Sequence, residues 1–391
     1  MRNFTWKIPT EVVFGRDTER QAGTLVRKYG GSRVLVVYGG GSAVRSGLLD
    51  RICASLADAG LYCRTFGGVQ PNPRLDKARE GVKLAIGEGI DFLLAVGGGS
   101  VIDTAKAIAH GTANPETDIW DFWQRKAPLE RSLPVGAVLT IPAAGSEMSD
   151  SAVLTDEATA RKWGLSTELN RPAFAILNPA LTATLPKYQV ACGTADILMH
   201  TLDRYFNPCA DNELTDAIAE ALLRTVIANG PAAVDDPGNY HAMSELMWAG
   251  SLSHNGLTGL GGQKDFAVHQ LGHELSARYD VAHGASLTAV WRAWASYVCG
   301  SNPARFARFA RNVWGMEGGK EEALAAAGIS AMVDFFRDLG LPTTIGALDI
   351  ILTDGDLDRL ADGCSRGRSR SIGSLRVLDW DDMRAIYEAA R

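Results

Sequence analysis

The chain has 391 residues, of which 46% are hydrophobic and 21% charged, and its formal net charge is −6. This length allows two or three domains with a sizeable core, and the lack of a basic excess argues against nucleic-acid binding. The start lacks the apolar segment of a secretory signal, and we find no run of about twenty apolar residues that would span a membrane. The six cysteines form no CxxC pair. We therefore expect a cytoplasmic protein with reduced thiols and no thiolate zinc site.

The first half of the chain alternates short apolar strands with helical segments. Strands are predicted at residues 5–14 (an edge strand), 33–38, 62–66, 91–96, 135–141 and 174–177, and helices at 43–59, 75–87 and from the second glycine turn to His110. This alternation is typical of a Rossmann-like α/β domain with a parallel sheet covered on both faces.

Helical periodicity dominates after the proline-marked boundary at 178–186. Helices are predicted at 189–205, 213–229, 240–255, 264–278, 285–299, 303–314, 321–339 and 380–390. The predicted domains are therefore an α/β dinucleotide-binding domain, residues 1–180, and an all-helical catalytic domain, residues 181–391.

Two predicted strands end in the sequence Gly-Gly-Gly-Ser, at 39–42 and at 97–100, just before a helix. Neither turn has the spaced G-x-G-x-x-G fingerprint of a standard dinucleotide site. Glycines followed by a helix N-terminus nevertheless suit the binding of a pyrophosphate. The alternative is that each is a plain tight turn. The first turn lacks the carboxylate that usually selects NAD, and Arg45 follows it, which favours NADPH. After the second turn come Asp103 and Lys106, either facing a ligand or forming a surface ion pair.

Histidines and one aspartate form the strongest constellation. His269 and His273 are four residues apart and share a helix face, with His283 shortly after, and Asp196 and His200 repeat that spacing on another predicted helix. A buried unpaired carboxylate is costly, and a bound cation would remove that cost. Asp196, His200, His269 and His283 would suit Fe²⁺ or Zn²⁺. Spacing alone chooses neither the metal nor His269 over His273.

These motifs together resemble the iron-containing (group III) alcohol dehydrogenases, and most closely their NADPH-dependent butanol dehydrogenase or aldehyde reductase branch. The resemblance rests on the opening NFTWKIPTEVVFG, GGGSxxDxxK at 97–106, TIPAAGSE, NPxLTxTLP at 178–186, DxxxH at 196–200 and HxxxHxxxxxxxxxH at 269–283. It implies a dehydroquinate synthase-like fold, in which an α/β nucleotide-binding domain is followed by an all-α metal-binding domain. It also implies hydride transfer between nicotinamide C4 and a small metal-polarised aldehyde or primary alcohol.

The resemblance also assigns roles to residues. The implied metal ligands are Asp196, His200, His269 and His283; His273 lies beside the nicotinamide as a candidate proton donor, and Asp103 near the reacting end of the cofactor. The implied NADP(H) contacts are Gly39, Gly40 and Ser42 at the 2′-phosphate with Lys162 nearby, Gly97, Gly98, Gly99 and Ser100 at the pyrophosphate, and Thr140 and Ser149. Two departures are Ala144 in place of a hydroxyl and Asn178 in place of an aspartate. A homodimer through the N-terminal edge strand is a further implication.

Three other functions fit the sequence less well. A metal- and NAD-dependent lyase of the dehydroquinate synthase type needs several cations near the metal, and this region has only Lys264, Arg278 and Arg204. A zinc hydrolase needs a glutamate where Gln270 stands. A metal or nucleotide sensor would need a partner-binding segment, and we find none. The aromatic residues Trp120, Phe122 and Trp163 favour either an apolar carbonyl substrate or ordinary core packing.

Overall fold

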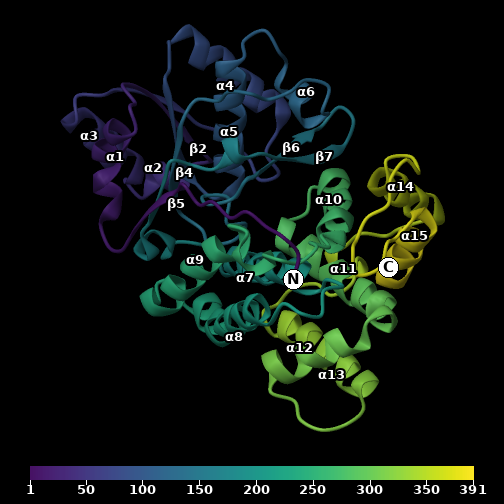
Figure 1. The fold of residues 1–391 in the computed structure, drawn as a ribbon. Coiled ribbons are helices and arrows are strands. Elements are labelled where there is room, and N and C mark those ends of the chain that lie inside the picture. The colour runs from purple at the N-terminus through teal and green to yellow at the C-terminus, as the bar shows by residue number, and fades with distance from the viewer. The chain divides into compact units, whose positions relative to one another are not determined.

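The computed structural model describes residues 1–391 and contains two compact units (Figure 1). One unit is Lys7–Thr184, and the other combines Met1–Trp6 with Leu185–Arg391. The boundary expected after residue 180 thus lies close to the observed one. The first residues, however, belong to the helical unit, where the terminal ammonium lies 2.5 Å from Asp211 Oδ2 and Arg2 N–H donates to the Gly261 carbonyl at 2.9 Å.

The α/β unit contains a six-stranded parallel sheet in the order β1-β8-β5-β4-β2-β3. Its strands are β1 (Glu11–Phe14), β2 (Arg33–Tyr38), β3 (Tyr62–Phe66), β4 (Phe92–Gly97), β5 (Val135–Leu139) and β8 (Phe174–Leu177). The central strands β4, β5 and β8 are buried throughout, which is why they read as continuous apolar runs. The predicted parallel sheet is therefore confirmed, although β1 is much shorter than the edge strand expected from residue 5.

Helices cover both faces of this sheet, with α1 and α3 on one side and α4 and α5 on the other (Figure 1). The helices of this unit are α1 (Ala22–Lys28), α2 (Ser42–Arg45), α3 (Leu48–Asp58), α4 (Leu75–Gly87), α5 (Gly99–Ala113) and α6 (Ile119–Trp123). The single helix predicted over 43–59 is two helices, because Gly47 adopts a left-handed conformation with φ 67° between them. Glycine tolerates this conformation at no steric cost.

An antiparallel hairpin, which the sequence analysis missed, follows the loop after β5. It pairs β6 (Ser151–Asp156) with β7 (Arg161–Ser166). Trp163 of β7 stacks on Trp120 with ring centroids 5.6 Å apart, and Phe122 is buried in the same apolar cluster. The three aromatic residues are therefore part of the core beneath the hairpin.

The second unit is helical, as predicted. Its helices are α7 (Lys187–Tyr205), α8 (Glu213–Asp235), α9 (Tyr240–His254), α10 (Ala267–Tyr279), α11 (His283–Val298), α12 (Pro303–Trp314), α13 (Glu321–Asp338), α14 (Asp354–Ser365) and α15 (Trp380–Ala390). The helix α14 was not predicted. One large apolar cluster joins these helices, and α7 and α10 both pack on α11.

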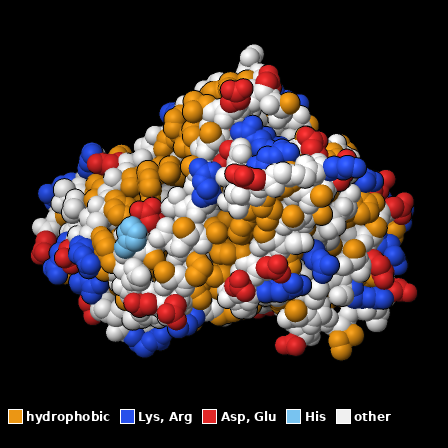
Figure 2. All heavy atoms as spheres, turned by 90° about the horizontal axis from the view of Figure 1, so that it is seen from below, with side chains coloured by type: hydrophobic (Ala, Val, Ile, Leu, Met, Phe, Trp, Pro, Cys, Tyr) orange, Lys and Arg blue, Asp and Glu red, His pale blue; other side chains and the backbone are white.

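Helix α8 corrects one expectation from the sequence, since its length and composition would allow it to cross a membrane. Its acidic side chains instead form ion pairs inside the helical unit: Asp216 with Arg305 at 2.5 Å, and Glu220 with Arg308 at 2.6 Å. Its Leu223 is fully buried. These contacts are those of a core helix. On the face shown in Figure 2, acidic and basic side chains are interspersed without a large patch of one sign.

Candidate active site

Three imidazoles of the helical unit converge on one carboxylate oxygen of Asp196. Asp196 and His200 lie one turn apart on α7, His269 lies in the first turn of α10, and His283 opens α11. Oδ1 of Asp196 is 3.4 Å from Nε2 of His200, 3.7 Å from Nε2 of His269 and 3.7 Å from Nε2 of His283. Asp196, His200 and His269 are buried, whereas the His283 side chain keeps 24% of its exposure.

These distances fit a metal ion better than a hydrogen-bond network. They exceed ordinary N–H···O separations of about 2.7–3.2 Å. They match the spacing of about 3.2–3.6 Å between ligand atoms that each lie about 2.0–2.2 Å from one tetrahedral cation. Moreover, Oδ1 of Asp196 and Nε2 of His269 are buried without a hydrogen-bond partner. Asp196, His200 and His269, whose ligand atoms all lie within 4.8 Å of one another, therefore form a donor set that suits a divalent cation, and His283 approaches the same Asp196 oxygen.

His273 lies one turn beyond His269 on α10 and does not reach Asp196. Its ring centroid is 6.3 Å from that of His269 and 5.3 Å from that of His283, and the residue is 8% exposed. The structure thus brings His269, and not His273, against the carboxylate, a choice that spacing alone left open.

Burial and neighbouring charges set the protonation of the imidazoles. Burial holds the pKa of His200 well below its ordinary value, and the nearby His254 and His269 rings lower it further, so His200 is neutral. Burial also lowers the pKa of His269, but the neighbouring carboxylates of Asp196 and Asp203 outweigh this effect and raise the pKa overall. A cation beside Asp196 would take the place of the proton on Nε2.

The sequence analysis missed Asp203. Its Oδ2 atom lies 2.5 Å from Nδ1 of His269, on the ring edge away from Asp196. Asp203 follows His200 by three residues on α7, so helical spacing could have placed it on the same face. The signal in the sequence was an aspartate, Asp203, within a largely apolar helical segment.

Asp103 and Lys106 on α5 form an i,i+3 ion pair at 3.9 Å, but the pair is buried and not at the surface as the alternative expected. Asp103 accepts hydrogen bonds from the Ser146 hydroxyl and, at 2.9 Å, from the Val153 N–H. Lys106 donates to the Ser146 and Ser151 carbonyls at 2.7 and 2.8 Å. Burial raises the pKa of Asp103 and lowers that of Lys106 to about 8. Both side chains tie α5 to the segment that leads into the hairpin.

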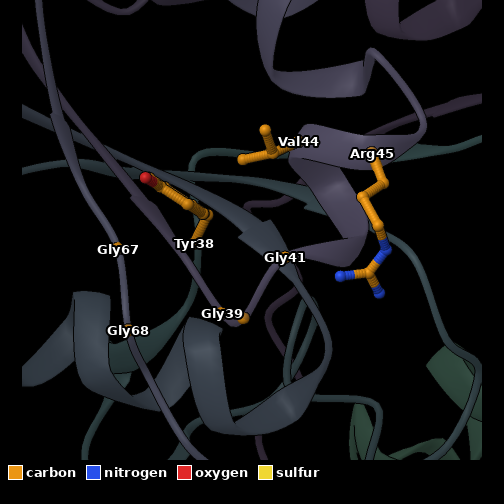
Figure 3. A pocket seen from close by; sticks show the side chains of 8 residues that line it. Tyr38, Gly39, Gly41, Val44, Arg45, Gly67 and Gly68 are labelled. Atoms are coloured by element: carbon orange, nitrogen blue, oxygen red, sulfur yellow. The ribbon is translucent and has the colours of Figure 1, made fainter.

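The first glycine turn lines a shallow pocket of about 500 Å³ (Figure 3). Its lining residues are Tyr38, Gly39, Gly40, Gly41, Val44, Arg45, Gly67 and Gly68, with no carboxylate among them. In Figure 3 the Tyr38 ring and the Arg45 guanidinium extend to opposite sides of the turn, and Gly67–Gly68 runs beside it. Ser42 begins the short helix α2 directly after the turn.

The second glycine turn joins β4 to α5. Gly97 ends the strand, Gly98 caps the helix, and Gly99 and Ser100 form its first turn, where backbone N–H groups lack helical partners. A Cβ at Gly98 would lie 2.4 Å from Cγ2 of Ile141. A Cβ at Gly99 would lie 3.2 Å from that of Ala144, so the residue that departs from the family pattern lies against this turn.

The remaining predicted cofactor residues lie elsewhere in the α/β unit. Thr140 N–H donates to the Gly97 carbonyl at 3.2 Å, beside the second turn, and the Ser149 hydroxyl donates to the Ser151 carbonyl at 3.2 Å. Lys162 is not among the residues that line the first pocket. Its ammonium donates to Asn72 Oδ1 at 2.9 Å. Arg45 is the cation that lines the first pocket.

Family models match both units. Residues 9–179 match the iron-containing alcohol dehydrogenase model, and residues 190–391 match the C-terminal model of the Fe-containing alcohol dehydrogenase family. This chain belongs to the iron-containing alcohol dehydrogenase family. The oxidoreductase class expected from the sequence is thereby confirmed, together with a metal and a nicotinamide cofactor as the family's requirements.

Two similar proteins differ in cofactor. The chain is 37% identical to NADH-dependent butanol dehydrogenase A of Clostridium acetobutylicum over 99% of each chain, and 36% identical to the NADPH-dependent aldehyde reductase YqhD of Escherichia coli over 100% of each. The crystal structure of NADH-dependent butanol dehydrogenase A from Thermotoga maritima covers 100% of this chain and 99% of its own, with a TM-score of 0.95 and 37% identity. These similarities confirm the predicted fold class. Both NADH-dependent and NADPH-dependent enzymes occur among the relatives.

Proposed function

We propose that this enzyme reduces small aldehydes, and oxidises the corresponding primary alcohols, with NADP(H) and one divalent metal. The observation that carries the proposal is the approach of three imidazole Nε2 atoms to Asp196 Oδ1 at 3.4–3.7 Å. Asp196, His200, His269 and His283 are the ligands in this proposal.

When bound, the metal supplies Lewis acidity that polarises the carbonyl oxygen of the substrate. The chain's own contribution is to hold the ligands in place and keep them in the correct protonation state. Burial keeps His200 neutral, and the Asp203 carboxylate accepts a hydrogen bond from Nδ1–H of His269. Fe²⁺ and Zn²⁺ both suit this donor set, and family membership favours iron.

His273 is the proposed proton donor. It is buried beside the ligand set, with its ring centroid 5.3 Å from that of His283, yet it makes no approach to Asp196 like that of His269. An imidazole in this position can hold and release a proton near neutral pH.

The preference for NADP(H) is supported by the first glycine turn. The pocket there has Arg45 and several glycines among its lining residues and no carboxylate that would repel a 2′-phosphate. We propose contacts from Gly39, Gly40, Ser42 and Arg45 to that phosphate, from Gly97–Ser100 to the pyrophosphate, and from Thr140, Ser149, Lys162 and Asp103 further along the cofactor.

The subunit is proposed to act in the cytoplasm as a homodimer. Strand β1 ends the sheet order, so one of its edges is unpaired in the subunit and could pair with β1 of a second copy. Light scattering after gel filtration would measure the mass of the assembly, and a monomer would contradict the proposal.

The decisive experiment follows the absorbance of NADPH and NADH with a panel of aldehydes, before and after chelation and re-addition of Fe²⁺ or Zn²⁺. We expect aldehyde-dependent NADPH oxidation that chelation abolishes and either metal restores. Turnover without net consumption of reduced cofactor would indicate the lyase alternative. Equal or better activity with NADH would contradict the cofactor preference.

A further inference from the structure

A second carboxylate contacts the metal-binding imidazole of His269 from behind. Asp203 is 1% exposed on α7, and its Oδ2 atom lies 2.5 Å from Nδ1 of His269. The other ring nitrogen, Nε2, is the one that lies 3.7 Å from Asp196. Because an ionised carboxylate only accepts hydrogen bonds, Nδ1–H of His269 is the donor to Asp203, and Nε2 is left as the ring atom that faces Asp196 and could bind a cation.

The same oxygen also holds the backbone of His269. Helix α10 begins after Phe266, which has φ 58° and a side chain that cannot cap a helix. The His269 N–H lies 3.4 Å from Asp203 Oδ2, and the Asp265 N–H donates to the Asp203 carbonyl at 2.8 Å. A negative charge at a helix N-terminus is stabilised by the helix dipole. Asp203 therefore orients the His269 ring and helps to hold the start of α10, where Asp265 Oδ1 accepts from the Ala267 N–H at 3.0 Å.

The second oxygen of Asp203 shows that folding alone does not account for this residue. Oδ1 is buried and has no hydrogen-bond partner. Leaving a buried carboxylate oxygen unpaired costs stability. That cost is offset when the imidazole in contact with the other oxygen is itself bound to a cation.

We propose that Asp203 is a positioning residue, which holds the His269 ring by its Nδ1–H so that Nε2 is aimed at the metal, without itself touching metal or substrate. The inference rests on the ligand set proposed above. It makes α7 the main support of the site, since Asp196, His200 and Asp203 share one face at spacings of four and three residues. Two of them are ligands, and the third orients a ligand from another helix.

The test uses Asp203→Asn and Asp203→Ala in the full chain, with Co²⁺ added to metal-free protein as the probe. The asparagine amide can donate to Nδ1 and so permits the tautomer with a proton on Nε2; alanine removes the contact altogether. For each variant we expect Co²⁺ affinity, measured by competition with a chelator, to fall about 10- to 100-fold, with a changed visible spectrum.

Asp216→Asn is the matched control. Asp216 is also buried, at 2% exposed, but it pairs with Arg305 away from the ligands. This variant is expected to unfold at a lower urea concentration while keeping the parent's Co²⁺ affinity and spectrum.

Three outcomes would overturn the inference. One is affinity within about twofold of the parent in both Asp203 variants. Another is failure of metal-free Asp203→Asn to fold while Asp216→Asn folds, which would make Asp203 only a cap of α10. The third is absence of Co²⁺ binding by the parent protein. This outcome would contradict the proposed ligand set as well, whereas the first two outcomes would contradict only the role of Asp203.

Discussion

Asp196 and His283 lie on different helices, yet Oδ1 of Asp196 is 3.7 Å from Nε2 of His283. Asp196 sits in the middle of α7, whereas His283 is the first residue of α11, after the short break that follows α10. The packing of α7 and α10 on α11 is what brings these two residues together.

The first prediction concerns Asp196, the residue that all three imidazoles approach. Asp196→Ala should abolish metal retention and lower turnover by at least about 10²-fold, because removal of the only carboxylate ligand opens the site. Metal content after gel filtration, measured by elemental analysis, checks this. The control is Asp211→Ala, which removes an exposed carboxylate that pairs with the terminal ammonium of Met1, and this variant should keep the metal. An active, metal-free Asp196→Ala enzyme would refute the ligand set.

The second prediction separates proton transfer from metal binding. His273→Ala should keep the metal but lose about 10²- to 10⁴-fold in kcat, as expected when a general acid is removed. Its pH–rate profile should also lose the limb that reports the imidazole. Loss of metal together with activity would show that His273 is a ligand, contrary to its position in the structure.

The third prediction concerns cofactor choice at the first glycine turn. Arg45→Ala should raise the KM for NADPH about 10- to 100-fold, since a charge-assisted contact to phosphate contributes about 1.5–3 kcal/mol. The KM for NADH should change little, because NADH has no 2′-phosphate. Steady-state kinetics with both cofactors measure these KM values. The control is Arg51→Ala, which removes a cation of α3 that pairs with Glu19. Equal effects on both cofactors would contradict a phosphate contact.

The fourth prediction concerns the pH dependence of stability at His110, which is fully buried between Ser132 and Asn170. Burial lowers its pKa from 6.5 to about 4. Between these values the unfolded chain binds a proton that the folded chain does not, so the free energy of unfolding falls as pH drops from 6.5 towards 4. The contribution is about 3 kcal/mol.

Substitution isolates this contribution. His110→Gln should show a smaller loss of unfolding free energy between pH 6.5 and 4.5 than the parent, measured by urea titration. His241→Gln, at an exposed histidine, should behave like the parent. An identical pH dependence for all three proteins would show that His110 takes up its proton with an ordinary pKa.

Local sequence patterns were sufficient for the parallel sheet and most helices. The runs at 33–38 and 174–177 coincide with β2 and β8, because short apolar segments between turn residues have few alternatives to a buried strand. The run at 62–66 coincides with β3, a largely exposed strand at the edge of the sheet. The hairpin β6–β7 was missed because its exposed positions are polar and its first strand continues a loop of small residues. The helix α8 was expected to end earlier, and it instead continues through Pro231.

The sequence by itself determined the candidates for the proposed metal site, since Asp196–His200 and His269–His273 each lie one helical turn apart and the family motifs surround them. Only the tertiary structure decided which histidine faces the carboxylate and which acid stands behind it. Periodicity fixes which residues share a face of one helix, but the direction of that face depends on packing between helices. Asp203 contacts His269, and Lys162 contacts Asn72, through hydrogen bonds between segments far apart in the chain, which no local pattern encodes.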